Sequence, residues 1–185
     1  MLRTVTTIFA LMLLPVAAEA QHQPYAGLEQ RSVKSLSDRE IEDLRAGRGM
    51  GMALPAELNG YPGPIHVLEL ADKLQLSARQ RERTRALFEA MQAEAVPLGE
   101  RLVQQEAALD RAFAQRTITA RSLDEMTASI GATRASLRAA HLRYHLSQNE
   151  ILSPDQIARY ASLRGYGDPA SHGNGKHDPA RRHHK

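Results

Sequence analysis

The sequence contains no cysteine and no tryptophan, and aromatic residues make up only 4% of its 185 positions. The absence of cysteine excludes a disulfide framework and a cysteine nucleophile, so a chain of this size must be stabilised by helix packing or by oligomerisation. The low aromatic content and a middle part rich in Ala, Leu, Arg, Glu and Gln favour long amphipathic helices over a β-sandwich or an α/β core. We therefore expect an all-α protein.

Long apolar runs are also rare, and the run near the N-terminus has the features of a secretion signal. Arg3 precedes an apolar stretch at residues 6–17, and Ala18-Glu19-Ala20 is a small-x-small cleavage pattern. The stretch is too short to cross about 30 Å of hydrocarbon, and no cysteine follows that could carry a lipid anchor. The sequence thus predicts a signal peptide over residues 1–20 and a mature protein in the periplasm without a membrane span.

Motifs of common enzyme classes are missing. The chain has no Gly-x-Ser-x-Gly elbow and no His-Glu-x-x-His pair, and the glycines of residues 47–51 neither follow a predicted strand nor precede a phosphate-loop lysine. The formal charge of +3 comes from interleaved acidic and basic residues, which indicates a mixed solvated surface, and an exported protein is not expected to bind nucleic acid. The sequence therefore favours a binding protein over an enzyme.

Chain breakers and capping signals divide the chain into four parts. The last part is rich in His and Arg and has no apolar pattern, so we expect it to be disordered. The parts are the signal peptide (1–20), a lead-in with one short helix (21–60), a helical domain (61–164) and the tail (165–185).

Within the lead-in, residues 21–36 show little apolar periodicity and are expected to be loosely held. The short helix should begin at the capping box of Ser37 and Glu40 and end at the glycine-rich stretch that follows. Pro64 then favours the start of the next helix, which is expected over residues 65–74.

Two long amphipathic helices are predicted for most of the domain. The first begins at the capping box of Ser77 and Gln80 and has apolar residues at steps of three or four. Pro97 interrupts it, which predicts a kink rather than two helices, because the apolar face resumes in phase. The second begins at Thr119 and has an apolar period of about 3.5, typical of a seam packed against another helix. The apolar positions are Leu87, Met91, Ala95, Leu98, Leu102, Leu109 and Phe113 in the first helix, and Leu123, Met126, Ile130, Thr133, Leu137, Ala140 and Tyr144 in the second.

Two long helices joined by a short polar turn must lie antiparallel, here as a kinked hairpin flanked by short helices. The last of these helices should begin after the cap Ser153 and end near Arg164. Because the apolar surface of the hairpin is thin and one-sided, we expect a second copy to complete it in a symmetric homodimer.

One pattern, Leu-Ser-x-x-Gln, occurs twice, as Leu76-Ser-Ala-Arg-Gln80 and Leu152-Ser-Pro-Asp-Gln156. A single capping box is common, whereas two copies that bracket a long helix pair are much more specific. Over residues 60–164 the chain resembles the Spy/CpxP family of periplasmic LTxxQ-motif proteins, with Ser in place of the family's usual Thr. The motif residues are expected to shape the fold rather than to touch a ligand; they are Leu76, Ser77, Gln80, Leu152, Ser153 and Gln156.

The resemblance implies a bent four-helix protomer in a cradle-shaped antiparallel dimer. It also implies one of two functions, either ATP-independent chaperone action on unfolded envelope proteins or heavy-metal sensing and resistance. The sequence leaves open whether a membrane sensor or regulator is a further partner. The chaperone hypothesis requires no cofactor.

A chaperone surface needs adaptable apolar side chains and long basic ones, for which Met50, Met52, Arg79 and Arg83 are the candidates. The alternative is that the arginines belong to a solvated helix face. In the same way, other methionines of the chain could fill the core of the hairpin.

Metal binding is the second hypothesis. His66 and Glu69 are one helical turn apart, as are His141 and His145 beside the apolar seam. If the earlier helix folds back onto the second long helix, these side chains would form an N₃O set suited to Zn, Ni, Co or Cu. The alternative is that His141 and His145 are half-exposed surface residues bonded to neighbours. A looser metal-binding role, or a solubilising one, is expected for the tail histidines His172, His177, His183 and His184.

Overall fold

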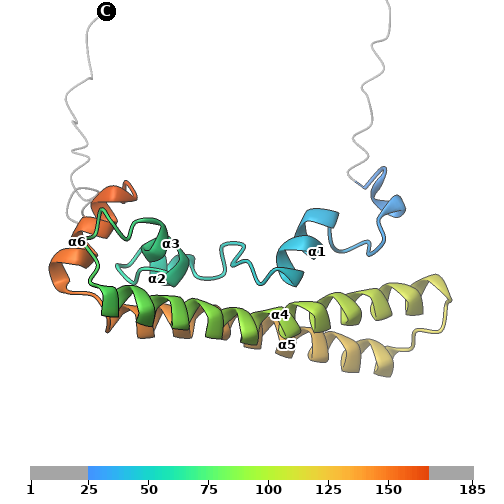
Figure 1. Ribbon diagram of the computed structural model, residues 1–185. Helices are drawn as coiled ribbons and strands as arrows, with labels where there is room; N and C mark the ends of the chain where they lie inside the picture. Colours follow the sequence, from blue (N-terminus) through green and yellow to red (C-terminus); the bar gives the residue numbers. More distant parts are fainter. Residues whose placement is uncertain (1–24, 167–185) are drawn as a thin grey trace, which may run out of the picture.

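The computed structural model describes residues 25–166, and in this range the chain is helical (Figure 1). Helices take up 69% of these residues and no strand is present among them, which confirms the predicted all-α class. The predicted signal peptide and the tail histidines lie outside the described residues. The elements are the 3-10 helix η1 (Leu28–Gln30) and the α-helices α1 (Asp38–Arg45), α2 (Leu54–Glu57), α3 (Pro64–Glu69), α4 (Ala78–Ala114), α5 (Ala120–Asn149) and α6 (Pro154–Leu163).

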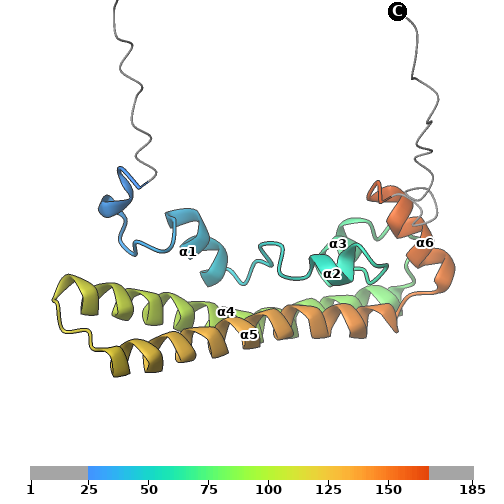
Figure 2. The same ribbon diagram turned by 180° about the vertical axis from the view of Figure 1, so that it is seen from behind.

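α4 and α5 form a long antiparallel helix pair that runs the length of the molecule (Figures 1 and 2). Near one end the Gln148 side-chain amide donates to the Thr84 hydroxyl at 3.2 Å, and further along the Gln105 amide donates to the Ser129 hydroxyl at 2.7 Å. Residue numbers therefore rise along α4 as they fall along the facing side of α5, as expected for two helices joined by a short turn. α4 continues through Pro97 as a single helix.

All four predicted capping boxes are formed. The Ser77 hydroxyl accepts from the backbone N–H of Gln80 at 3.2 Å, and the Gln80 side chain accepts from the N–H of Ser77 at 3.0 Å. The same reciprocal bonds open α1, α5 and α6 at Ser37, Thr119 and Ser153. Because these bonds satisfy N–H groups that the first helical turn leaves unpaired, four consecutive residues are enough to specify each helix start.

The short elements η1, α1, α2 and α3 form a second layer on one face of the helix pair, and α6 lies at the end where α4 begins (Figures 1 and 2). Val33 and Leu36 are each only 4% exposed, so the part of the lead-in from Val33 onward is packed on the pair rather than loosely held. Two apolar residues in one turn have no period that a sequence pattern could reveal. The main core cluster consists of Val33, Leu36, Ile41, Leu44, Met91, Ala95, Leu102, Val103, Ile130 and Leu137.

The helix predicted over residues 65–74 is shorter than expected, because α3 ends at Glu69 and the chain then turns, with a φ of 52° at Gln75. Val67 and Leu74 are nevertheless buried, and they form a second core cluster with Tyr160 of α6. α2 was not predicted, since its four residues are too few to show a helical period.

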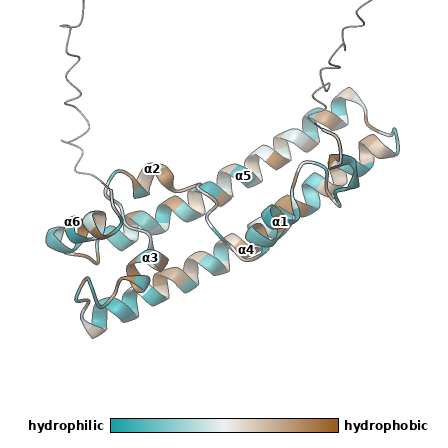
Figure 3. Ribbon diagram, turned by 90° about the horizontal axis from the view of Figure 1, so that it is seen from above, coloured by the Kyte–Doolittle hydropathy of each residue, from teal (hydrophilic) through white to brown (hydrophobic). Residues whose placement is uncertain are grey.

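Seen from above, hydrophilic and hydrophobic residues interleave along both long helices (Figure 3), in agreement with a thin apolar stripe. Among residues 25–166 no helix is both long enough and apolar enough to serve as a membrane span.

Candidate functional site

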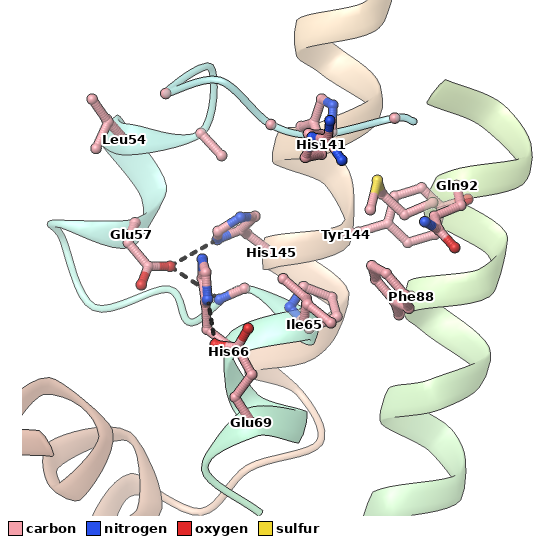
Figure 4. Close-up of a pocket in the computed structure, with 18 of the residues that line it drawn as sticks. Leu54, Glu57, Ile65, His66, Glu69, Phe88, Gln92, His141, Tyr144 and His145 are labelled. Carbon is pink, nitrogen blue, oxygen red and sulfur yellow. Dashed lines mark hydrogen bonds and ion pairs between the residues drawn. The ribbon is translucent and has the colours of Figure 1, made fainter. Parts of the chain in front are cut away.

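A cavity of about 430 Å³ lies between the helix pair and the second layer (Figure 4). Residues 46–53, α2 and α3 line it from the second layer, α4 and α5 line it from the pair, and Arg164 and Tyr166 complete it after α6. Its volume falls in the range of roughly 300–1,000 Å³ that is typical of small-molecule sites.

The walls of the cavity are mainly apolar. Phe88 and Met91 of α4 and Tyr144 of α5 line it where the two long helices face each other (Figure 4). Leu54 of α2 and Ile65 of α3 line it from the second layer, and both side chains also reach solvent. A ligand here would contact apolar surface from both layers of the fold.

The four residues predicted as metal ligands, His66, Glu69, His141 and His145, all line this one cavity. They are not arranged as a metal site, since no group of three or more His, Cys, Asp or Glu side chains within residues 25–166 could hold a metal ion. His66 is instead paired with Glu69, with 2.9 Å between the imidazole Nδ1 and a carboxylate oxygen.

The two histidines of α5 are buried, so the interpretation of half-exposed surface residues is wrong. His145 is 8% exposed, and its Nδ1 lies 2.7 Å from the backbone oxygen of Tyr61. Because that oxygen can only accept, Nδ1 carries a proton and donates to it. The Tyr61 carbonyl lies 84 positions away from His145 in the sequence, so this partner was not predictable from a local pattern.

His141 is 5% exposed, and its Nε2 has no hydrogen-bond partner among the described residues. Burial, together with the neighbouring His145, lowers the pKa of His141, because an apolar environment disfavours the charged ring. His141 is therefore neutral at neutral pH. A buried nitrogen without a hydrogen-bond partner lowers the stability of the fold. A ligand that forms a hydrogen bond with this nitrogen would recover that stability.

Sequence analysis missed Glu57, which is 8% exposed at the end of α2 and lines the cavity. One carboxylate oxygen accepts from the hydroxyls of Tyr160 and, at 3.0 Å, Tyr166; the other accepts from the N–H of Gly63 at 3.1 Å. Burial and the adjacent carboxylate raise the pKa of Tyr160, which therefore remains a hydrogen-bond donor. These partners are distant in sequence from Glu57, so no local pattern could have identified it.

Two further groups complete the surroundings of Glu57. The Arg164 guanidinium and the His145 Nδ1 each lie 3.7 Å from a carboxylate oxygen. Gly63 makes this packing possible, since a Cβ there would lie 2.9 Å from the His145 ring. The chain is thus held against the fold as far as Tyr166, slightly beyond the predicted start of the tail.

Of the residues predicted to contact clients, Met50, Arg79 and Arg83 are exposed, whereas Met52 is partly buried against the main core cluster. Several exposed apolar residues that follow Met50 in the sequence were not predicted. Over residues 50–65 the exposed large apolar side chains are Met50, Leu54, Leu58, Tyr61 and Ile65. We call these five residues the apolar rim.

The residues of the repeated motif contribute to the core and to the helix caps. Leu76 and Leu152 are buried in the second core cluster, and the two motif serines cap α4 and α6. Gln80 and Gln156 bond to each other between the two helix starts.

Fold and cavity together define an all-helical, two-layer protein with a ligand-sized space between the layers. No protein-family model, no curated protein and no solved structure matches this chain.

Proposed function

We propose that this protein is an ATP-independent, chaperone-like protein that binds unfolded polypeptides in the periplasm. The apolar rim carries this proposal: five large apolar side chains are exposed within sixteen consecutive positions, from Met50 to Ile65. Clustered exposed apolar groups are typical of interaction sites rather than of inert surface.

The chemistry of the rim suits weak and varied clients. Met50 offers a flexible, polarisable side chain, and Leu54 and Leu58 lie one helical turn apart. Surfaces with adaptable apolar groups can repack against different partners. The predicted signal peptide and the resemblance to the Spy/CpxP family support the same function and compartment.

An aggregation assay tests the proposal. Several unfolded clients are diluted from denaturant with substoichiometric to equimolar protein, and light scattering is followed. The wild type should suppress scattering, and a variant with Leu54→Ser, Leu58→Ser and Ile65→Ser should not. A variant with Leu146→Ser and Leu163→Ser, which removes exposed apolar groups outside the rim, is the matched control and should remain active. Failure of the wild type to suppress any client, or full activity of the rim variant, would overturn the proposal.

A second copy of the chain is proposed as a partner, in the antiparallel homodimer that the resemblance implies. The end of the helix pair near the α4–α5 turn supports the dimer, because Phe113 is 53% exposed there and Leu109 and Met126 are only partly buried. Sedimentation equilibrium should give twice the chain mass. A monomer at micromolar concentration would contradict this.

Metal binding is the second candidate, favoured by the convergence of His66, Glu69, His141 and His145 on one cavity. Zn, Ni, Co or Cu would have to displace the His66–Glu69 pair to reach the Nδ1 of His66. The test is a metal titration of a chain ending at Tyr166, which keeps every described contact and removes the tail histidines. Submicromolar binding that disappears in a His66→Gln, His141→Gln variant would support the site, and equal binding by that variant would exclude it.

A further inference from the structure

The charged groups that line the cavity already have protein partners. Glu57 and both guanidinium groups have a partner of opposite charge nearby, and the Glu69 carboxylate is hydrogen-bonded to His66, so a charged ligand would have to break one of these contacts or lie unpaired against apolar walls. An uncharged ligand avoids this cost. The pairs are Arg48 with Asp43, Glu69 with His66 at 2.9 Å, and Glu57 with Arg164 at 3.7 Å.

The imidazoles of His141 and His145 each keep a nitrogen without a hydrogen-bond partner among residues 25–166. The Nε2 of His141 is buried and unpaired within the described chain, and the hydrogen bond from His145 Nδ1 to the Tyr61 oxygen leaves the Nε2 of that ring available to a ligand. A hydroxyl suits both nitrogens, because it donates to an unprotonated nitrogen and accepts from a protonated one.

The apolar walls favour a flat ring. Phe88 and Tyr144 present aromatic surfaces, and Met91 adds a thioether that packs well against aromatic edges. Opposite them, Leu54 and Ile65 supply aliphatic contacts from the second layer.

We propose that the cavity binds small, uncharged phenols, with the aromatic ring between Phe88, Met91 and Tyr144 and the hydroxyl on the imidazoles of His141 and His145. The proposal does not rest on the chaperone proposal, since it needs neither a polypeptide client nor a second copy of the chain, although Leu54 and Ile65 belong both to the apolar rim and to the cavity wall.

Isothermal titration calorimetry of the full chain at pH 7.5 tests which functional group the cavity binds. The three ligands have similar shapes and differ in the group at one end of the ring. 4-Propylphenol should bind saturably with one-to-one stoichiometry. 4-Propylanisole, in which a methyl group replaces the hydroxyl proton, should bind about tenfold more weakly, the effect of one lost hydrogen bond. 4-Propylbenzoate, a carboxylate at neutral pH, should not bind. Anisole or benzoate binding as tightly as the phenol, or no binding of the phenol, would overturn the proposal.

Variants locate the site. His141→Phe keeps a planar ring and removes both nitrogens, so it should weaken phenol binding about tenfold, the effect of one lost hydrogen bond. Gly49→Leu should block both ligands, because a Cβ at Gly49 would lie 3.8 Å from His141 Nδ1. Gly131→Leu, at a helical glycine with open space around it, is the matched control and should bind like the wild type. Binding that is unchanged in Gly49→Leu would exclude the cavity.

One further ligand separates a free phenol from a tyrosine side chain of a polypeptide. N-acetyltyrosinamide carries the same ring and hydroxyl on a peptide backbone and should bind more weakly than 4-propylphenol. Tighter binding of the tyrosine derivative would assign the cavity to a polypeptide and overturn the proposal.

Discussion

The side-chain amide of Gln80 donates a hydrogen bond to the side-chain oxygen of Gln156 at 2.8 Å, although 76 positions separate the two residues. Each glutamine also closes the capping box of its own helix. Their amide nitrogens bond to distant carbonyls as well, Gln80 to Ile151 at 3.0 Å and Gln156 to Leu74 at 3.2 Å. The two copies of the motif are therefore one structural unit that joins the start of α4 to the start of α6. Glutamate could close a capping box equally well, but it has no N–H to donate.

Replacing Gln80 by Glu is expected to lower the free energy of unfolding by about 1–3 kcal/mol, because buried carbonyls lose their donor while the capping box survives. Urea denaturation followed by circular dichroism measures the change. Glu40→Gln is the matched control, since Glu40 closes the capping box of α1 with Ser37 and makes no such bond between helices. Equal losses in the two variants would show that the glutamine pair contributes nothing beyond capping.

Gly99→Ala is expected to destabilise the fold, because a Cβ there would lie 2.1 Å from the backbone oxygen of Leu44, where α1 crosses α4. Overpacking against backbone costs about 1–3 kcal/mol. Gly131→Ala, at an open helical position, should instead stabilise by about 0.5–1 kcal/mol. Thermal unfolding of both variants provides the comparison. Stabilisation by Gly99→Ala would mean that α1 does not pack against α4 at this point.

Tyr160→Phe is expected to cost about 1–3 kcal/mol, because the buried Glu57 carboxylate loses a donor in a site that water reaches poorly. Tyr166→Phe removes a second donor to the same oxygen from a less buried side chain, so its cost should be smaller. Chemical denaturation at pH 7.5 measures both. A larger loss in Tyr166→Phe would contradict the placement of Tyr160 as the principal partner.

Stability should fall as the pH drops below about 6.5, the ordinary pKa of histidine, because the unfolded chain then takes up a proton that folded His141 resists. The sign follows from the lowered pKa of the buried ring: above both pKa values the group adds no pH dependence, and below the unfolded value protonation favours unfolding. Urea midpoints between pH 7.5 and pH 5.5 should decrease less in His141→Gln than in the wild type. Identical slopes would mean that His141 is not buried as described.

The long helix pair was predictable because its signals are repeated many times. Leu87, Met91 and Ala95 on one helix, and Ile130, Thr133 and Leu137 on the other, follow helical spacing over many turns. The predicted apolar positions are buried in the middle of the pair, at Met91, Ala95 and Leu137. Near the α4–α5 turn the prediction is wrong, because Phe113 is exposed. The pattern identifies a face, but it does not determine how far a second layer extends over that face.

The site was only partly predictable. One-turn spacing predicted that His66 lies beside Glu69 and that His141 and His145 share a helix face, and all four line the cavity, but not as a group that could hold a metal ion. Glu57 was missed because its partners lie far away in sequence.

The sequence by itself determined where the helices begin and that the two longest ones pair, since a capping box and an apolar period depend only on neighbouring residues. The tertiary structure alone decided which polar groups are buried. Glu57, His141 and His145 carry no sign of burial in their local sequence, and they become buried only when α2 and α3 fold over the helix pair. Burial of a polar group depends on partners that the chain supplies from elsewhere, so it is a property of the assembled layers and not of the segment that carries the residue.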